Sequence, residues 1–226
     1  MSASSLTFHP AEVAIRSGAV TMDGFLEVPP GAKGLVLFAH GSGSGRHSTR
    51  NQHVAEALRQ RGIGTLLFDL LTEGEEQLDA RSGHLRFDIP FLAARLSLAT
   101  GWVRGNSNLA RSPIGYFGAS TGAAAALVAA ALEGSGIAAV VSRGGRPDLA
   151  GQSLSLVRAP TLLVVGGEDT DVLALNKVAF SRLAAVKQLE IVEGAGHLFE
   201  EPGTLERVAG LAGDWFQEHF ERRSAR

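Results

Sequence analysis

Short apolar runs alternate with longer amphipathic stretches from residue 33 almost to the end of the 226-residue chain. The run Lys33–Ala39 is nearly continuous in apolar residues, which is typical of a strand buried on both faces of a parallel sheet. The stretch 49–61 instead repeats apolar residues at helical spacing, and Gly62 follows it as a stop signal. Strands that alternate with helices predict an α/β fold in which helices cover both faces of the sheet.

The same periodicities assign eight strands. Two strands joined by a turn at Ser17-Gly18 predict an antiparallel hairpin at the sheet edge, between about residues 10 and 30. The other strands are predicted near 33–39, 64–71, 114–118, 136–142, 161–165 and 187–192, and the helices near 49–61, from Asp88 or Pro90 onward, and near 123–132, 173–183 and 202–219. The charged stretch 72–87 is predicted to be a loop, and residues 221–226 are expected to fray.

These elements predict one α/β domain over residues 1–226, built on a mostly parallel, twisted, eight-stranded sheet. No insertion long enough to form a lid domain follows the strand at 136–142, so we expect an open and shallow pocket. In such folds ligands bind at the carboxyl ends of the strands. The loops that follow the predicted strands are therefore the places to search for chemistry.

Composition and charge exclude several classes of protein. The net charge of −2 does not favour binding to nucleic acid or to an anionic membrane. The chain has no cysteine, which removes disulfides, thiolate metal sites and a cysteine nucleophile. Residues 1–10 show no signal-peptide pattern, and the longest apolar run, 123–132, is too short to span a bilayer. We therefore expect a cytoplasmic protein without nucleic-acid or membrane partners, as a monomer or homodimer.

A serine sits in the sharp turn between the central strand and an alanine-rich helix. The segment Gly118-Ala119-Ser120-Thr121-Gly122 has the spacing of a nucleophile elbow, which lifts a serine hydroxyl above the strand ends. Glycines at both ends of such a turn let the strand and helix backbones approach closely. The pattern alone could also be a turn of small residues, but the strand before it and the helix after it favour Ser120 as a nucleophile.

A serine nucleophile needs a base, and the base needs a carboxylate that orients it. His197 follows the last predicted strand, and the chain order of serine, acid and histidine is that of the α/β-hydrolase arrangement. Asp169 and Asp171 share one loop after the preceding strand. Asp169 lies nearer the strand end and is favoured as the acid, whereas Asp171 fits better as a helix cap. Glu168 is a more remote alternative.

An oxyanion hole for this chemistry needs two N–H donors. The N–H of Thr121, directly after the nucleophile, is one candidate, and Ser42 in the glycine-rich loop 40–48 is the other, with Gly43 as an alternative. The loop lacks the Lys-Ser/Thr ending of a phosphate-binding loop, so a nucleotide site is the weaker interpretation. His40, just before it, is interpreted as structural.

Four stretches together resemble the α/β-hydrolase superfamily, and within it the compact dienelactone hydrolase-like branch: LVLFAHGSGSGRHSTRN, YFGASTGAAAAL, APTLLVVGGEDTDVLALN and VEGAGHLFEEPG. The similarity runs from about residue 33 to residue 220. The resemblance implies that Ser120 is the nucleophile, Asp169 the acid and His197 the base. Dienelactone hydrolase proper has a cysteine nucleophile, whereas this chain has serine, so the resemblance concerns the fold and the catalytic machinery.

Together these observations predict a serine hydrolase that cleaves small carboxylic esters or lactones through a Ser-His-Asp triad, without a metal or organic cofactor. Gly41, Arg46 and Arg143 are candidate substrate-binding residues near the predicted pocket mouth. We hypothesise that Arg143, directly after a strand, recognises an anionic group on the substrate. The alternatives are a thioesterase or acyltransferase with the same triad, and a non-catalytic binding protein of the same fold.

Overall fold

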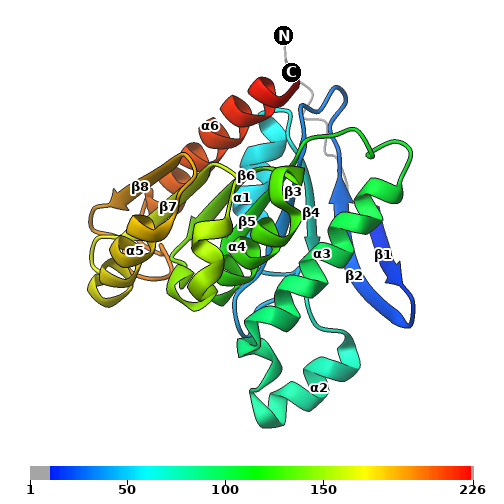
Figure 1. The fold of residues 1–226 in the computed structure, drawn as a ribbon, viewed down its shortest axis with the longest axis horizontal. Coiled ribbons are helices and arrows are strands. Elements are labelled where there is room, and N and C mark those ends of the chain that lie inside the picture. Colours follow the sequence, from blue (N-terminus) through cyan, green and yellow to red (C-terminus); the bar gives the residue numbers. More distant parts are fainter. Residues whose placement is uncertain (1–10, 225–226) are drawn as a thin grey trace.

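The computed structural model describes residues 11–224 and contains one eight-stranded sheet flanked by helices (Figure 1). The strands lie in the order β1-β2-β4-β3-β5-β6-β7-β8. Their bounds are β1 (Ala11–Ser17), β2 (Val20–Glu27), β3 (Leu35–Ala39), β4 (Gly64–Phe68), β5 (Ile114–Ala119), β6 (Ile137–Arg143), β7 (Thr161–Gly166) and β8 (Lys187–Val192). The pairs β1–β2 and β2–β4 are antiparallel and all the others are parallel. The predicted edge hairpin and the mostly parallel sheet are confirmed.

Each face of the sheet has its own apolar core and its own helices. Helices α1 (Thr49–Gln60) and α6 (Thr204–Ser224) pack on one face. Helices α3 (Ile89–Gly105), α4 (Thr121–Glu133) and α5 (Thr170–Arg182) pack on the other. This arrangement explains why β3 and β5, at the centre of the sheet, are buried at every residue.

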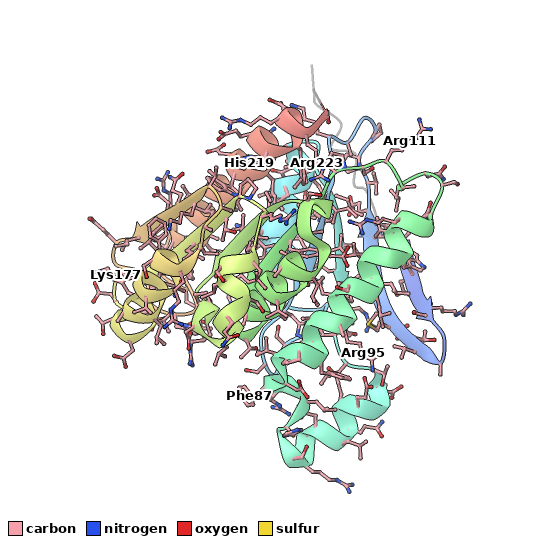
Figure 2. All side chains as sticks on the ribbon, in the orientation of Figure 1. Phe87, Arg95, Arg111, Lys177, His219 and Arg223 are labelled. Atoms are coloured by element: carbon pink, nitrogen blue, oxygen red, sulfur yellow. The ribbon has the colours of Figure 1, made fainter. Side chains whose placement is uncertain are left out.

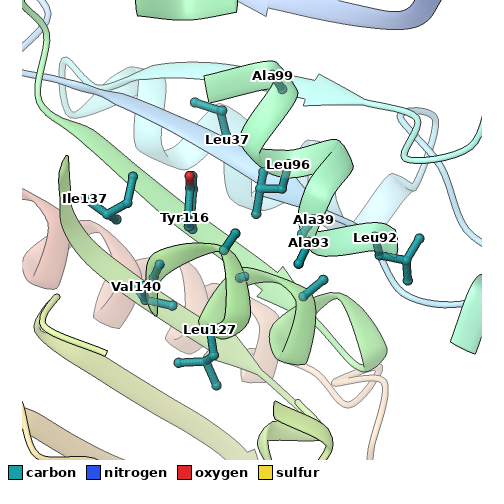
Figure 3. Close-up of a cluster of buried hydrophobic side chains, with 14 of the residues drawn as sticks. Leu37, Ala39, Leu92, Ala93, Leu96, Ala99, Tyr116, Leu127, Ile137 and Val140 are labelled. Carbon is teal, nitrogen blue, oxygen red and sulfur yellow. The ribbon is translucent and has the colours of Figure 1, made fainter. Parts of the chain in front are cut away.

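The core under α3 contains a hydrogen bond between two buried hydroxyl groups. Figure 3 shows Tyr116 of β5 among Leu37, Leu96 and Ile137, all of them buried side chains of the same cluster. Its phenol oxygen lies 2.6 Å from the hydroxyl oxygen of Thr100 on α3, and the two share a hydrogen bond. A buried hydroxyl without such a partner would be costly, so this bond fixes how α3 sits on the sheet.

The prediction of a loop at 72–87 is wrong. Residues Glu73–Ser82 form α2, and Leu85–Phe87 form the short 3-10 helix η1. Thr72 and Glu75 make a reciprocal capping box at the start of α2, and Gly83 ends it in the left-handed conformation. The run of charges suggested a loop because the capping signal is short and the helix has only a weak apolar face.

Other predicted boundaries move by a few residues. The strand predicted at 64–71 ends at Phe68. Two further 3-10 segments, η2 (Gly134–Gly136) and η3 (Pro147–Leu156), lie before and after β6, and only a loop was expected at the second. Helix α6 continues through residues 221–224, where fraying was expected. There Lys33 pairs with Glu221, and the Arg223 guanidinium donates to the carbonyl of Ile137. Residues 225–226 and the segment 1–10, expected to lack a signal peptide, lie outside the described residues.

Across residues 11–224, none of the helices combines the length and the apolar character that crossing a bilayer requires.

A methyl group at Gly122 is expected to lower the thermal stability. The added Cβ would lie 2.6 Å from the carbonyl carbon of Ala39, and backbone there cannot give way cheaply. We expect Gly122→Ala to cost about 1–3 kcal/mol, which lowers the melting temperature by roughly 3–10 °C. Gly101→Ala, at an exposed position of α3, is the matched control, because a Cβ there meets nothing within 4 Å and alanine favours the helix. Equal melting temperatures for the two variants would contradict the packing argument.

Candidate active site

Ser120 lies at the point where β5 ends and α4 begins. Its φ of 51° and ψ of −123° make it one of two non-glycine residues with positive φ in residues 11–224. Backbone atoms crowd the glycines on both sides of Ser120, Gly118 and Gly122. An added Cβ at Gly118 would lie 2.7 Å from the carbonyl oxygen of Gly122, within the same turn. This strained and crowded backbone is what the nucleophile-elbow pattern predicts, and it orients Ser120 away from the sheet.

His197 is joined to Asp169, the first of the three candidate acids. Nδ1 of His197 and Oδ2 of Asp169 lie 2.6 Å apart in a hydrogen bond. Asp169 follows the end of β7 and takes the N-cap position of α5 without capping it through its side chain. Asp171, expected to be the helix cap, lies exposed in the first turn of α5 instead. Glu168 is exposed, and only its backbone N–H is tied to the histidine loop, through the carbonyl of Ala195.

The loop after β6 brings the serine and the histidine to the same place. The N–H of Ser120 donates to the carbonyl of Arg143 over 3.3 Å, and the carbonyl of Ser120 accepts from the N–H of Arg146 over 3.0 Å. Between these residues, an added Cβ at Gly144 would lie 3.0 Å from the carbonyl oxygen of His197. The described residues contain no hydrogen bond between the Ser120 hydroxyl and His197. Catalytic hydrogen bonds are often loose until substrate binds.

The glycine-rich loop after β3 lies directly against Ser120. An added Cβ at Gly41 would lie 3.0 Å from the Cβ of Ser120. The N–H of Ser42 donates to the hydroxyl of Thr121 over 3.0 Å. Thr121 opens α4, and the first N–H groups of a helix have no partner inside it. Both candidate oxyanion donors therefore lie beside Ser120, although the Ser42 N–H is engaged with a neighbouring hydroxyl.

Arg46 is held by the protein itself. The Arg46 guanidinium forms an ion pair with Asp69, which follows β4. The backbone N–H of Arg46 also donates to the Asp69 carboxylate over 2.7 Å. Asp69 was not identified as a site residue from the sequence. Its position just after a strand end could have marked Asp69 as a site residue. Its partner Arg46, however, lies 23 residues away in the sequence, so the pair itself could not be recognised there. Asp69 thus fixes the shape of the loop 41–48, and Arg46 has little capacity left for a substrate.

A cavity of about 780 Å³ lies beside the glycine-rich loop. Its walls come from residues 40–50, from Asp69, Leu70 and Leu71, and from Glu76, Asp79 and Arg86 of the α2–η1 segment, with Leu92 and Thr121. Burial, followed by the charge of Asp69, raises the pKa of Glu76. In Figure 2, Arg95 reaches from α3 toward this segment, where it pairs with Glu75. The wrongly predicted loop thus forms one wall of the pocket.

His40 is buried between the same loop and β4. Its Nε2 accepts from the N–H of Leu70 over 3.0 Å, and its Nδ1 lies 3.0 Å from the carbonyl of Gly41, to which it donates in that tautomer. Burial lowers the pKa of His40 below 6.5, against smaller opposite effects of Gly41 and Asp69. The structural interpretation of this histidine agrees with these contacts.

Stability is expected to fall as the pH drops below about 6.5, because the unfolded chain then binds a proton that folded His40 resists. The contribution of neutral His40 to the free energy of unfolding is fully present above pH 6.5. It is lost as the pH falls from 6.5 to the lower pKa that His40 has in the folded state. Urea denaturation at pH 7.5 and 5.5 would measure it. His40→Gln keeps a donor and an acceptor but does not titrate, so it should reduce the difference in unfolding free energy between the two pH values. If that difference were unchanged in the variant, other titrating groups would cause it.

Arg143 is buried, with 7% of its surface exposed. Its Nε and Nη1 atoms are buried and make no hydrogen bond within the described residues. Burial, and next the charge of Arg50, lowers the pKa of Arg143 to about 10. The sequence suggested an arginine at an open pocket mouth, whereas the structure places it under cover beside the His197 loop. Among residues 11–224 no cluster of three or more histidine or acidic side chains suits a metal ion.

No family model matches the chain. Two curated proteins from strains of Mycobacterium tuberculosis, provisionally named phosphoribosyl transferases, are 57% identical over 209 residues. The match covers 92% of this chain and 46% of theirs, so the chain spans about half the length of these relatives. The crystal structure of a dienelactone hydrolase from Anabaena variabilis is 55% identical with a TM-score of 0.91, covering 93% of this chain and 98% of that one. An alpha-beta serine hydrolase homologue from Coxiella burnetii, 19% identical with a TM-score of 0.72 over 90% and 96% of the two chains, shares the fold.

Proposed function

Because the chain belongs to the dienelactone hydrolase-like family of the α/β hydrolases, we propose that it is a serine hydrolase of small carboxylic esters or lactones. The observation that carries the proposal is the 2.6 Å hydrogen bond between His197 and Asp169, beside a strained Ser120 at a strand end. Nucleophile, base and orienting acid are the three groups that acyl transfer through a serine requires.

The reaction follows from the roles of these groups. The Ser120 oxygen attacks the acyl carbon while Nε2 of His197 takes its proton, and the same proton then goes to the leaving alcohol. A water molecule, activated by His197, attacks the acyl-enzyme and releases the acid. Asp169 keeps the proton on Nδ1 of His197 and stabilises the imidazolium that forms in each step.

The N–H groups of Thr121 and Ser42 stabilise the oxyanion of each tetrahedral intermediate in this proposal. In the free protein the Ser42 N–H donates to the Thr121 hydroxyl. The arrival of a negatively charged oxygen gives this donor a stronger acceptor, and the threonine hydroxyl can rotate away.

Phosphoribosyl transfer is not proposed for this chain. The mycobacterial relatives are named as whole proteins, and this chain matches only 46% of their length. The match to the dienelactone hydrolase covers nearly the whole of both chains. The activity of the remaining half of those relatives has no bearing on the residues around Ser120.

A fluorophosphonate probe tests the proposed nucleophile. We expect stoichiometric labelling of the wild-type protein at Ser120, located by peptide mass spectrometry, and loss of labelling in His197→Ala because the serine is then no longer activated. Ser181→Ala, at an exposed position on α5, is the control and should label as the wild type does. A folded wild-type protein that does not react would refute the hydrolase proposal.

A further inference from the structure

Residues 143–146, which we call the β6 loop, connect the nucleophile to the segment that carries the base. The first carbonyl of the loop accepts from the N–H of Ser120, and its last N–H donates to the carbonyl of Ser120. Between them, the N–H of Gly144 donates to the carbonyl of Val164 on β7 over 2.8 Å. An added Cβ at Gly144 would lie 3.0 Å from the carbonyl oxygen of His197. The position of this loop therefore affects how Ser120 and His197 lie relative to each other.

Asn176 of α5 holds the remaining residue of the β6 loop, Gly145. The Nδ2 of Asn176 donates to the carbonyl of Gly145 over 2.9 Å and to the carbonyl of Val172, one turn back on α5, over 2.8 Å. Asn176 is fully buried, whereas the next residue, Lys177, which Figure 2 labels, is exposed. The bond to Val172 fixes the direction of the amide, so its second N–H stays aimed at the loop.

The backbone at Gly145 has little room to move. An added Cβ at Gly145 would lie 2.5 Å from the Cβ of Ala123, in the first turn of α4. Gly145 is itself buried, so its carbonyl cannot turn to water if the amide of Asn176 is removed. The loop is thus packed against α4 and hydrogen-bonded to α5 at the same residue.

The stability of α5 alone does not explain an asparagine at this position. Asparagine is less favourable than leucine or alanine inside a helix, because its side chain competes for backbone groups. Oδ1 of Asn176 is buried and has no hydrogen-bond partner within residues 11–224, which adds a desolvation cost. The contact that sets Asn176 apart is the bond to Gly145, which lies outside its own helix.

Helix α5 also carries the acid of the candidate site. Asp169 is the N-cap residue of α5, and Asn176 lies about two turns further along the same helix. Asp169 is bound to His197 over 2.6 Å. One short stretch of helix therefore connects the acid and base at its start to the loop that holds Ser120.

From these contacts we infer that Asn176 is a positioning residue. By holding the carbonyl of Gly145, it fixes the β6 loop and with it the distance between the Ser120 hydroxyl and the imidazole of His197. The inference rests on the proposed hydrolase function and adds to it a residue outside the triad. Asn176 acts through the backbone of Gly145 and not through the substrate. A misplacement of about 1 Å can lower the rate of an enzyme a hundredfold, so this contact should affect turnover.

The first experiment removes the hydrogen bond. Asn176→Leu keeps the branching of the side chain and favours the helix but cannot donate to Gly145. We expect kcat for p-nitrophenyl butyrate to fall by roughly ten- to a hundredfold, with KM within about threefold of the wild type. The loss should lie in kcat because the substrate still binds while the nucleophile and base no longer lie at the right distance.

The matched control is Thr161→Val, which also removes a buried hydrogen bond to a backbone carbonyl. The hydroxyl of Thr161 donates to the carbonyl of Ala159 over 3.0 Å, at the end of β7 away from the acid. Both variants should melt at a lower temperature than the wild type. Thr161→Val should keep kcat within about twofold, since its loss does not reach the β6 loop. This comparison separates positioning from a general loss of stability.

Asn176→Asp gives a readout that lost packing would not change. A carboxyl buried at this position should have a pKa above its usual range. Below that pKa the protonated group can donate to the carbonyl of Gly145, whereas above it the carboxylate repels the same oxygen. We expect the ratio of variant to wild-type kcat to fall by roughly tenfold from pH 6 to pH 9, at a temperature where both are folded. This variant also decides the question if Asn176→Leu does not fold, and a ratio independent of pH would contradict the inference.

Hydrogen exchange tests the contact without catalysis. Mass spectrometry of peptides that span residues 143–146 should show faster exchange in Asn176→Leu than in the wild type, and no change in Thr161→Val. A folded Asn176→Leu with wild-type kcat would overturn the inference, and labelling of Ser120 by the fluorophosphonate would leave the hydrolase function standing. If Ser120 of the wild type does not react, the catalytic proposal fails instead, and faster exchange in Asn176→Leu still shows that Asn176 holds the loop.

Discussion

Ser120→Ala is expected to lower kcat for p-nitrophenyl ester hydrolysis by roughly ten-thousandfold or more, with the fold intact. Removing the hydroxyl removes the acyl-enzyme route altogether, and only the oxyanion donors and substrate binding remain to accelerate direct attack by water. The substitution deletes one oxygen at a site where the hydroxyl makes no hydrogen bond in the described structure, so stability should change little. Steady-state kinetics and a melting curve on the same preparation measure both quantities.

The control for this prediction is Ser44→Ala, which removes a hydroxyl from the wall of the cavity beside the glycine-rich loop. It should keep kcat within about threefold of the wild type, since surface or cavity hydroxyls outside the reacting groups contribute little to the chemical step. If Ser120→Ala retained a tenth of the wild-type kcat, a different residue would be the nucleophile and the proposed mechanism would be abandoned.

Asp169→Asn should lower kcat by roughly a thousandfold to ten-thousandfold. The Asp169 carboxylate accepts a hydrogen bond from Nδ1–H of His197 over 2.6 Å, which leaves Nε2 free to act as the base. An asparagine amide can donate to Nδ1 instead, and the imidazole then carries its proton on Nε2, where it cannot accept one from Ser120. The loss should appear in kcat more than in KM, because the charge on the imidazole develops only during the reaction.

Asp171→Asn is the matched control, with the same chemical change two residues away. Asp171 is exposed in the first turn of α5 and makes no hydrogen bond to the histidine within the described residues. We expect its kcat to stay within about twofold of the wild type. A large loss in Asp171→Asn with a small loss in Asp169→Asn would show that the loop rearranges during catalysis and that the acid is Asp171.

Local sequence signals were sufficient to predict the strands of the sheet and the position of Ser120 between a strand and a helix. The apolar runs mark β3 to β7 because strands buried on both faces leave an uninterrupted pattern, and the elbow needs glycines at fixed offsets from Ser120. The sequence favoured Asp169 over Asp171 because Asp169 is nearer the strand end, but it could not show which carboxylate reaches His197. Both follow the same strand, and which carboxylate meets His197 depends on the turn between β7 and α5, where Asp169 rather than Asp171 takes the cap position.

The features that sequence missed depend on contacts between distant segments. Helix α2 is held by ion pairs from Arg86 and Arg95, and Arg95 lies outside the charged run, on the next helix. The burial of Arg143 is likewise not readable from its own segment, and the next residue, Gly144, lies against His197 and Phe199, more than 50 residues further along the chain. In each case a charge that looks solvated in the sequence is removed from water by a segment that packs against it only in the folded chain.

The order of strands in the sheet has a consequence for how activity returns after denaturation. The glycine-rich loop follows β3, the serine follows β5, and the acid and histidine follow β7 and β8, so no contiguous piece of the polypeptide holds a working site. Parallel pairings between segments so far apart in sequence form slowly, whereas helices and hairpins form early. A refolding preparation should therefore regain its far-ultraviolet circular dichroism before it regains turnover, and the appearance of product reports the completion of the whole sheet.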